Sequence, residues 1–492
     1  MVSSSHLAAA FRELVRERPE SPALVWRGRE MSYAGLQALV LAARAAVDRA
    51  SAGPLCVVGE KSPQAVAMIL ACLDAGRSFL IPPPSIAPAA LDGLVARAGC
   101  VDVLDPRDIV SDSAAAVPAP AGHPAPAPYD PERISFMLTT SGSTGLPKVV
   151  PLTTGAVDRF TGWVHERFDV GPGRTVLNYA PLNFDVCLLD IWATLRSGGR
   201  VVLVDPDQST RASALVDLIA SNGVHIIQAV PMLYELLLQA GPGIRLESVE
   251  HVLITGDTIR PASLAQLPGL FPNARFYNLY GCTETNDSFL YEIPSPAKPP
   301  IPLPLGSLLP GVRARLVGED GTVLTDPGAG VGELYVSTPF QTSGYLGADL
   351  PEKFVPDPLG LDQRIYFRSG DLVRRDTIGR LTLVGRNDFQ VKIRGQRVNT
   401  RDVEQVLLEH EHVLEAVAIA LPDEQTGHRL HAVVRRRPGS RLSGLQLRRH
   451  CAERLPAAAM PARLRITDEP LPATATGKID RNLIRNAELK ES

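Results

Sequence analysis

Residues 138–148 read LTTSGSTGLPK and place hydroxyl side chains, two glycines and a lysine directly behind the apolar run Ile134–Leu138. Glycines let backbone N–H groups turn toward an anion, hydroxyls add donors, and the lysine adds positive charge. Pro147 and the extended run Lys148–Leu152 follow, so we expect a strand, a loop and a second strand. The common P-loop differs because its Gly-Lys-Ser/Thr opens a helix. The chemistry is that of a polyphosphate site, and an exposed polar turn is the alternative interpretation.

Length and composition are those of a multidomain protein with ample apolar residues. The 492 residues are too many for one core, 45% are hydrophobic, and the net charge of −3 gives no reason to expect a nucleic-acid partner. Six scattered cysteines without a CxxC pair are typical of reduced thiols. The segment Phe11–Arg18 predicts an amphipathic helix and no signal peptide, and no apolar stretch is long enough to span a membrane. We therefore expect a cytoplasmic protein with no membrane partner.

Strands and helices alternate over the first two thirds of the chain. Ser62-Pro63 predicts the start of a helix that ends at Gly76, because Ser favours the N-cap and Pro the first turn. Short apolar runs of this kind are typical of buried parallel strands joined by right-handed crossovers. The fold class is therefore α/β, with a large N-terminal lobe of parallel or mixed sheets flanked by helices. The predicted strands are Leu55–Val58, Phe79–Ile81, Val201–Val204, His225–Val230 and His251–Ile254.

The pattern changes twice toward the C-terminus. After Pro304, short alternating strands such as Gly332–Val336 predict a small β-barrel-like subdomain. Beyond Asp388, strands and two helices, Thr400–His410 and Gly444–Leu455, predict a smaller, mobile α+β domain of about 100 residues. We expect domains at 1–386 and 387–492. The Ala/Pro-rich segment 113–128 is interpreted as an extended connector, and the dozen residues after 481 are too few for a carrier domain, so a free-standing enzyme is expected.

Five motifs in order resemble those of the adenylate-forming superfamily, which includes acyl-CoA synthetases, luciferases and adenylation domains of nonribosomal peptide synthetases. The resemblance covers nearly the whole chain from about residue 32. It implies an AMP-forming ligase that uses ATP and Mg²⁺ to convert a carboxylate into an acyl-adenylate with release of pyrophosphate. The motifs are Thr140–Lys148, Tyr280–Thr285, Ser369–Asp371, Gly385–Asp388 and Gly477–Lys478.

The resemblance implies a nucleotide site built from these motifs. Tyr280 is expected to stack on adenine, and Asn278 to contact the edge of the adenine ring. Asp371 is expected to bind the ribose hydroxyls, and Arg386 to contact the ribose or a phosphate. The alternative is that Asp371 and Arg386 form a structural ion pair. Ser369 stands where the family usually has Thr and keeps the hydroxyl. Val149 replaces the usual glycine, so we expect altered packing behind the loop and retained ATP binding. The ATP/AMP-binding residues are Thr140, Ser141, Gly142, Ser143, Thr144, Gly145, Lys148, Asn278, Tyr280, Asp371 and Arg386.

The resemblance also assigns the catalytic groups. Glu284 would bind magnesium, Thr283 would donate to phosphate, and Lys478 would stabilise the charge that develops between carboxylate and α-phosphate. Without the upstream motifs, Lys478 reads as an ordinary surface lysine. Asp388 matches the hinge on which the small domain changes orientation between half-reactions, and Gly395 the glycine that lets a pantetheine arm approach the backbone.

Phe184-Asp185-Val186-Cys187 resembles the element that holds the substrate's amino group in amino-acid-activating members. A buried carboxylate needs a cation, and acyl or aryl substrates offer none. The alternative is that Asp185 is the N-cap of a helix that contains Asp190, since Asp favours that position. We expect an amino acid, whether small and polar, cyclic such as proline, or a β-amino acid; Asp287 would contact the substrate or point to solvent. The expected pocket residues are Asp185, Val186, Leu189, Gln228, Ile254, Gly256, Leu279, Asp287 and Ser288.

The acceptor is expected to be the phosphopantetheine thiol of a separate carrier protein, as in nonribosomal peptide and antibiotic biosynthesis. The alternative is an acyl- or aryl-CoA ligase that uses free coenzyme A, for which Arg435-Arg436-Arg437 would bind the nucleotide 3′-phosphate unless it is only a solvated charge run. A nucleotide-binding regulator without catalysis is a third class. It would lack counterparts of Lys478 or Glu284, and both residues are present.

Overall fold

The computed structural model describes residues 6–109, 126–140, 147–325, 328–347, 350–386, 390–423, 427–472 and 479–491. The chain divides into two compact units. The first comprises Met1–Thr139 and Val149–Gly385, and the second comprises Thr140–Lys148 and Arg386–Ser492. Within the part of the chain that the structure describes, no helix is both long and apolar enough to cross a membrane. All six cysteines are free thiols.

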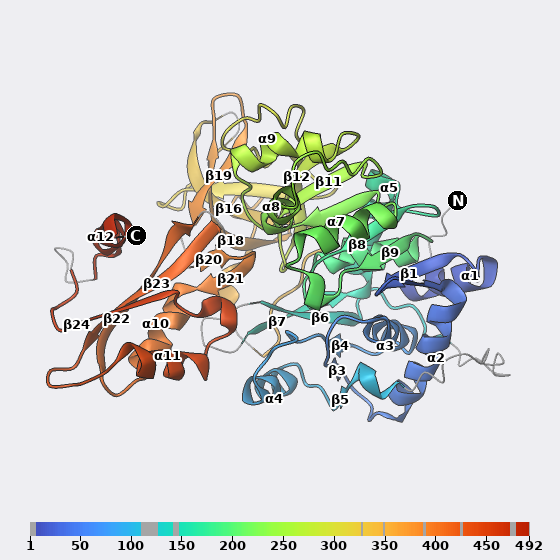
Figure 1. The fold of residues 1–492 in the computed structure, drawn as a ribbon, viewed down its shortest axis with the longest axis horizontal. Helices are drawn as coiled ribbons and strands as arrows, with labels where there is room; N and C mark the ends of the chain where they lie inside the picture. Colours follow the sequence, from blue (N-terminus) through green and yellow to red (C-terminus); the bar gives the residue numbers. More distant parts are fainter. Residues whose placement is uncertain are drawn as a thin grey trace. The chain divides into compact units, whose positions relative to one another are not determined.

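A nine-stranded sheet forms the centre of the first unit (Figure 1). Its inner strands run parallel, whereas β2, β13 and β14 pair antiparallel at the two edges. Parallel neighbours need crossover connections, which here are mostly helices. In spatial order the strands are β14 (Ser307–Leu308), β13 (Asn286–Glu292), β12 (Arg275–Cys282), β11 (His251–Thr255), β10 (Ile226–Ala229), β8 (Thr175–Asn178), β9 (Arg200–Leu203), β1 (Pro22–Trp26) and β2 (Arg29–Ser32).

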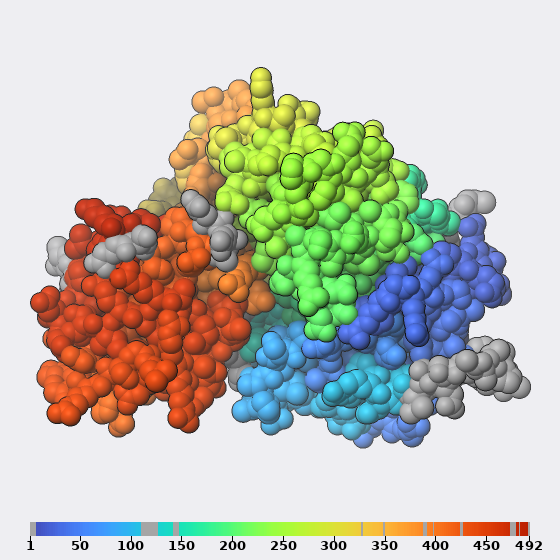
Figure 2. All heavy atoms as spheres, viewed as in Figure 1, coloured from blue at the N-terminus to red at the C-terminus, as the bar shows by residue number. Residues whose placement is uncertain are grey.

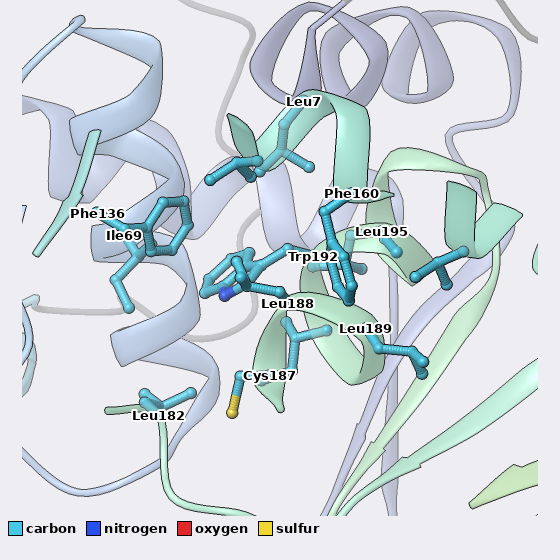
Figure 3. Packing of buried hydrophobic residues seen from close by; sticks show 14 of the residues in the cluster. Leu7, Ile69, Phe136, Phe160, Leu182, Cys187, Leu188, Leu189, Trp192 and Leu195 are labelled. Atoms are coloured by element: carbon cyan, nitrogen blue, oxygen red, sulfur yellow. The ribbon is translucent and has the colours of Figure 1, made fainter. Parts of the chain in front are cut away.

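Each face of this sheet is buried by a different set of elements. Helices α7 (Ala212–Ser221), α8 (Pro231–Gln239) and α9 (Pro261–Leu270) pack on one face and form the green to yellow-green surface of Figure 2. The opposite face packs against α5 (Thr154–Phe168) and a π-helix (Leu188–Ala193). Figure 3 shows Leu188, Leu189 and Trp192 pointing in different directions from this π-helix, with Trp192 close to Phe136. The π-helix therefore joins this face to the neighbouring sheet.

A second sheet of five strands carries the expected phosphate loop between its last two strands. The predicted helix is confirmed as α3 (Pro63–Asp74), whose N-cap Ser62 accepts a hydrogen bond from the Ala65 N–H. Three further helices, α1 (Leu7–Glu17), α2 (Tyr33–Arg49) and α4 (Pro88–Arg97), belong to this part of the unit. In spatial order the strands are β5 (Asp102–Leu104), β3 (Leu55–Val57), β4 (Phe79–Leu80), β6 (Ile134–Thr140) and β7 (Lys148–Thr153).

The expected small β subdomain is an antiparallel sheet of five strands. Its order is β15 (Arg313–Val317), β16 (Gly330–Ser337), β18 (Ile365–Arg375) and β17 (Phe354–Pro356), and β19 (Leu381–Arg386) pairs with β18. Short helices fill the connections of the chain: η1 (Pro106–Asp108), α6 (Thr194–Arg196), η3 (Pro206–Gln208), η4 (Pro351–Lys353) and η5 (Ala457–Ala459).

The second unit is an α+β structure with its own core. A three-stranded sheet buries alternate residues on opposite faces, as a strand's period of two requires. Ala416 and Ala418 pack with α10 and α11, whereas Val417 and Ile419 pack with Ile484 of α12. Its elements are the hairpin β20 (Gln390–Ile393) and β21 (Gln396–Asn399), α10 (Thr400–Leu408), β22 (Val413–Asp423), β23 (Gly427–Arg436), α11 (Gly444–Ala452), β24 (Arg463–Thr467) and α12 (Arg481–Glu491).

The expected end of one strand is wrong. The run Ala274–Tyr277 predicts a strand followed directly by a turn, but β12 continues to Cys282 and the turn is Thr283–Thr285. The cause is pairing with β13, which extends the ladder to Cys282 opposite Asn286. Gly281 permits this pairing, because a Cβ there would lie 2.5 Å from the Asn286 carbonyl oxygen.

Candidate adenylation site

The strand–loop–strand arrangement around the expected phosphate loop is present, since β6 ends at Thr140 and β7 begins at Lys148 in neighbouring positions of one sheet. Ser141, Gly142, Ser143, Thr144 and Gly145 lie outside the described residues, as do Asp388 and Lys478. Val149 is fully buried, packs with Cys56 and Met137, and accepts a hydrogen bond of 3.0 Å from the Leu346 N–H. The residue that replaces the family's glycine is therefore part of the core behind the loop.

Glu284 lies in the turn between β12 and β13, with its side chain almost completely buried. Its Oε1 accepts a hydrogen bond of 2.8 Å from the phenol of Tyr345, and its backbone carbonyl accepts one of 2.9 Å from the Thr342 N–H. The Tyr345 ring is fixed in turn by edge-to-face packing on Phe354. Sequence reasoning missed Tyr345, because nothing local marks a tyrosine 61 residues away as a partner of Glu284.

Tyr280 and Asp371 are joined by a hydrogen bond from the phenol to the carboxylate. Burial raises the pKa of Tyr280 well above its usual value, and the neighbouring Asp371 carboxylate raises it further, so the phenol remains a donor. Asp371 is oriented by Ser369, whose Oγ accepts from the Asp371 N–H at 3.0 Å and donates to the Leu334 carbonyl at 2.7 Å. The serine that stands in place of the family's threonine therefore makes two hydrogen bonds that hold the aspartate.

Other expected nucleotide and thiol residues occupy defined positions. Asn278 donates through Nδ2 to the Pro304 carbonyl at 2.8 Å, and Arg386 is the last residue of β19. Thr283 lies in the same turn as Glu284. Gly395 forms, with Arg394, the two-residue turn between β20 and β21, where both φ angles are positive. Such a hairpin turn favours glycine for conformational reasons alone, so the role of Gly395 toward a thiol remains a prediction.

The expected amino-acid pocket lies at the carboxyl ends of the parallel strands β8, β10, β11 and β12. Asp185 is in the loop that follows β8, Gln228 is near the end of β10, and Asp287 pairs with Gly281 at the end of β12. Ligands of open α/β sheets bind at this edge. Asp185 accepts from the Val186 N–H at 3.0 Å, and the helix that follows is capped at Cys187, so Asp185 is not that helix's N-cap.

A buried polar cluster supports the loop that carries Asp185. Asn178 donates through Nδ2 to Asp190 Oδ2 at 3.1 Å, and Asp190 is completely buried. Lys61 donates to three successive carbonyls, those of Asn178, Tyr179 and Ala180, at 3.0, 3.1 and 3.2 Å. Burial lowers the pKa of Lys61 to about 8 and raises that of Asp190 well above its usual value. Sequence reasoning did not find Lys61, because its partners lie more than 100 residues away in the sequence. It did not find Asn178 either, because the contact with Asp190 forms only when β8 packs against the π-helix.

The expected pocket residues do not all face the same way. Leu189 and Leu279 belong to the core on the π-helix face, whereas Ile254 packs among α7, α8 and α9 on the opposite face. The Ser288 hydroxyl contacts the Asn286 carbonyl and Thr285 Oγ1, both at 3.3 Å, within the hairpin. Val186 follows Asp185 in the loop, and Gly256 follows β11 with a positive φ.

Asp287 does not point to solvent. Its exposed fraction is 7%, and burial together with the Asp185 charge raises the pKa of Asp287 well above its usual value. Gln228 is more deeply buried, and its Oε1 has no hydrogen-bond partner among the described residues. Of the two alternatives for Asp287, exposure to solvent is therefore excluded.

Comparisons with known proteins identify the family. The family model described as AMP-binding enzyme matches residues 11–346, and the model of the AMP-binding enzyme C-terminal domain matches residues 402–478. The chain is 34% identical over 492 residues to phenyloxazoline synthase MbtB of Mycolicibacterium paratuberculosis, covering 96% of this chain and 41% of that protein. It is 31% identical over 354 residues to the L-proline--[L-prolyl-carrier protein] ligase of Pseudomonas fluorescens, covering 71% and 68%.

The fold is also that of solved structures. The chain matches NpsA-ThdA, an artificially fused adenylation–PCP di-domain from Klebsiella oxytoca, with a TM-score of 0.78 at 22% identity over 94% of this chain and 93% of that one. The present chain is shorter than its relatives among the curated proteins. Its match covers 41% of the length of one MbtB protein and 34% of the length of another. The sequence matches extend over both units, so the chain belongs to the family of AMP-binding enzymes.

Proposed function

We propose that the protein is an amino-acid adenylation enzyme. In the first step, a carboxylate oxygen of the amino acid bonds to the α-phosphorus of ATP, the bond between the α-phosphorus and the bridging oxygen breaks, and pyrophosphate leaves. In the second step, a phosphopantetheine thiolate of a carrier protein bonds to the acyl carbon, and AMP leaves with the electron pair. The main support for an amino-acid substrate is Asp185, whose carboxylate lies near the buried Asp287 at the carboxyl edge of the sheet. An ammonium group is the partner that such a site stabilises.

The remaining site residues fit the first step. Both reactants are anions, so the site must neutralise charge and hold an in-line geometry. Glu284, anchored by Tyr345, would hold Mg²⁺ together with the nucleotide phosphates, since nucleotide-bound magnesium takes only one or two carboxylates. The metal would neutralise phosphate charge. Asp371 is a natural acceptor for a ribose diol, and Lys478 would supply the charge that stabilises the transition state.

Domain roles follow from the same proposal. Residues 1–386 would bind ATP and the amino acid, and residues 387–492, with Asp388 as hinge, would deliver Lys478 for the first step and the Gly395 turn for the second. The described residues next to the Lys478 segment are held by two hydrogen bonds. The Asp480 N–H donates to the Pro472 carbonyl at 2.7 Å, and the Arg481 side chain donates to the Ala418 carbonyl at 3.1 Å.

A carrier protein is a better acceptor than free coenzyme A. The Pseudomonas ligase named above acts on a carrier protein by its name, and it is similar over 71% of this chain. The arginines considered for coenzyme A are engaged internally: Arg435 pairs with Glu415, Arg436 pairs with Asp468, and Arg437 donates to the Glu411 carbonyl. A cytoplasmic location is consistent with six free thiols.

Amino-acid-dependent ATP–pyrophosphate exchange tests the proposal. Purified protein with ATP and Mg²⁺ is assayed against each amino acid and against matched carboxylic acids that lack the amino group. Exchange with one or a few amino acids, followed by thioester formation on a phosphopantetheinylated carrier protein, is the expected result. Exchange with no acid would reject catalysis, and exchange only with acids that lack an amino group would reject the amino-acid substrate.

A further inference from the structure

Asp287 places a buried carboxyl group in the expected amino-acid pocket, where no group of the described protein pairs with it. It is on β13, 7% exposed, and no hydrogen bond or ion pair to its carboxylate exists among the described residues. Burying a carboxylate without a partner costs folding free energy, and such groups occur mainly at functional sites, where a ligand can supply the partner.

The surroundings of Asp287 are acidic. Asp185 and Asp190 are both close enough to interact with it electrostatically. Lys61 is a buried cation close to Asp190, and its ammonium already donates to the carbonyls of Asn178, Tyr179 and Ala180. One substrate α-ammonium at Asp185 would therefore leave the Asp287 carboxyl still without a cation.

Two further buried acceptors in this region lack a donor. Gln228 is 2% exposed and Asn183 is 6% exposed, and Gln228 Oε1 and Asn183 Oδ1 have no hydrogen-bond partner among the described residues. Asn183 is two residues before Asp185, and Gln228 is near the carboxyl end of β10. The unsatisfied groups are thus acceptors, and their complement is a ligand group with several N–H donors.

We propose that the substrate is a diamino acid, whose α-ammonium pairs with Asp185 and whose side-chain ammonium pairs with Asp287. Leu189 and Leu279, both buried on the π-helix face, would pack against the methylene groups between the two cations. A side-chain ammonium supplies the donors and the charge that the site lacks. This inference rests on the proposed adenylation function and names its substrate class.

The test compares matched pairs of amino acids in ATP–pyrophosphate exchange with the full chain: ornithine with norvaline, lysine with norleucine, and 2,4-diaminobutyrate with 2-aminobutyrate. We expect one diamino member to exceed its neutral partner by about tenfold or more in kcat/KM, as for a site with a buried polar group that the neutral analogue leaves unpaired. In Asp287→Asn the ratio should fall about tenfold or more, chiefly through a higher KM for the diamino acid. Asp217→Asn, an exposed aspartate on α7, is the control and should keep the wild-type ratio.

A thermal-shift assay gives a second readout that does not depend on turnover. The preferred diamino acid should raise the melting temperature of wild type more than that of Asp287→Asn. Exchange that favours a neutral side chain, or a selectivity ratio unchanged in Asp287→Asn, overturns this proposal and leaves the adenylation function in place. Exchange with no amino acid at all overturns both.

Discussion

The phenol of Tyr345 donates a hydrogen bond of 2.8 Å to Oε1 of Glu284 and so ties a residue beyond β16 to the turn between β12 and β13. This contact orients the carboxylate that we assign to magnesium. Orientation matters because octahedral Mg²⁺ tolerates little deviation in its ligands.

Tyr345→Phe should raise the Mg²⁺ concentration needed for half-maximal exchange by about 10-fold, because a hydrogen bond to a charged group contributes about 1.5–3 kcal/mol. The titration is made at saturating ATP and amino acid. Tyr366→Phe removes a phenol that donates to Asp362 in the small β subdomain, and it serves as the matched control. An unchanged Mg²⁺ requirement in Tyr345→Phe would contradict the assignment of Glu284.

Lys478→Ala should reduce adenylate formation by about 100-fold or more and leave ATP binding nearly unchanged, because it removes a contact made in the transition state. Pyrophosphate exchange and binding of a fluorescent ATP analogue measure the two effects separately. Lys490→Ala, on the exposed surface of α12, is the control. Normal turnover in Lys478→Ala would show that another group supplies the charge.

Asp185→Ala should lower kcat/KM for the preferred amino acid by about 30-fold or more, since loss of one partner of a hydrogen-bonded charge pair costs about 2–5 kcal/mol. Activity with the corresponding acid that lacks the amino group should change little. The control is Asp207→Ala, whose side chain is 84% exposed. Equal losses for both acids would mean that Asp185 supports the fold of the loop and does not bind the ammonium.

Lys61→Met should raise the KM for the amino acid more than it lowers kcat, because the ammonium holds three carbonyls of the chain that leads to Asp185. We expect an increase of about 10-fold, in line with loss of charge-assisted hydrogen bonds. Lys298→Met, at an exposed lysine, should have no effect. A kcat defect with normal KM would indicate that Lys61 acts on the chemistry and not on the loop.

Asp287→Asn should raise the melting temperature of the ligand-free protein at pH 8, with a gain that shrinks as the pH falls toward the ordinary aspartate range near 4. The folded-state pKa of Asp287 is raised above its unfolded value, so folding takes up a proton between the two values. Stability therefore falls as pH rises through that window, and the neutral amide avoids this loss. Thermal unfolding from pH 4 to pH 8 measures the difference. A wild type that is more stable than Asp287→Asn at pH 8 would show that the carboxylate already has a partner.

Local patterns were sufficient for most elements of the fold. The N-cap Ser62 and the following proline predicted the start of α3, and the apolar runs His225–Val230 and His251–Ile254 predicted β10 and β11. Helix ends were less certain, since α10 ends at Leu408 and not His410, and α11 ends at Ala452 and not Leu455. Terminal turns depend on capping that residue patterns specify only weakly.

A single local motif was enough to single out Glu284 and Asp371 as candidates, and their roles stay predictions. The candidate site was not predictable where distant segments meet. Lys61 contacts carbonyls 117 or more residues away, and pairing between β12 and β13 overrode the turn expected after Tyr277. These outcomes depend on tertiary packing, which no local pattern encodes.

The π-helix Leu188–Ala193 has a practical consequence for engineering. A π-helical turn accommodates one residue more than an α-helical turn, so removing a single residue would rotate the remaining side chains by about 100°. Asp190 would leave Asn178, and Leu189 would turn away from its neighbours. Chimeras that graft this loop between homologous enzymes should therefore conserve segment length before they match residue identity.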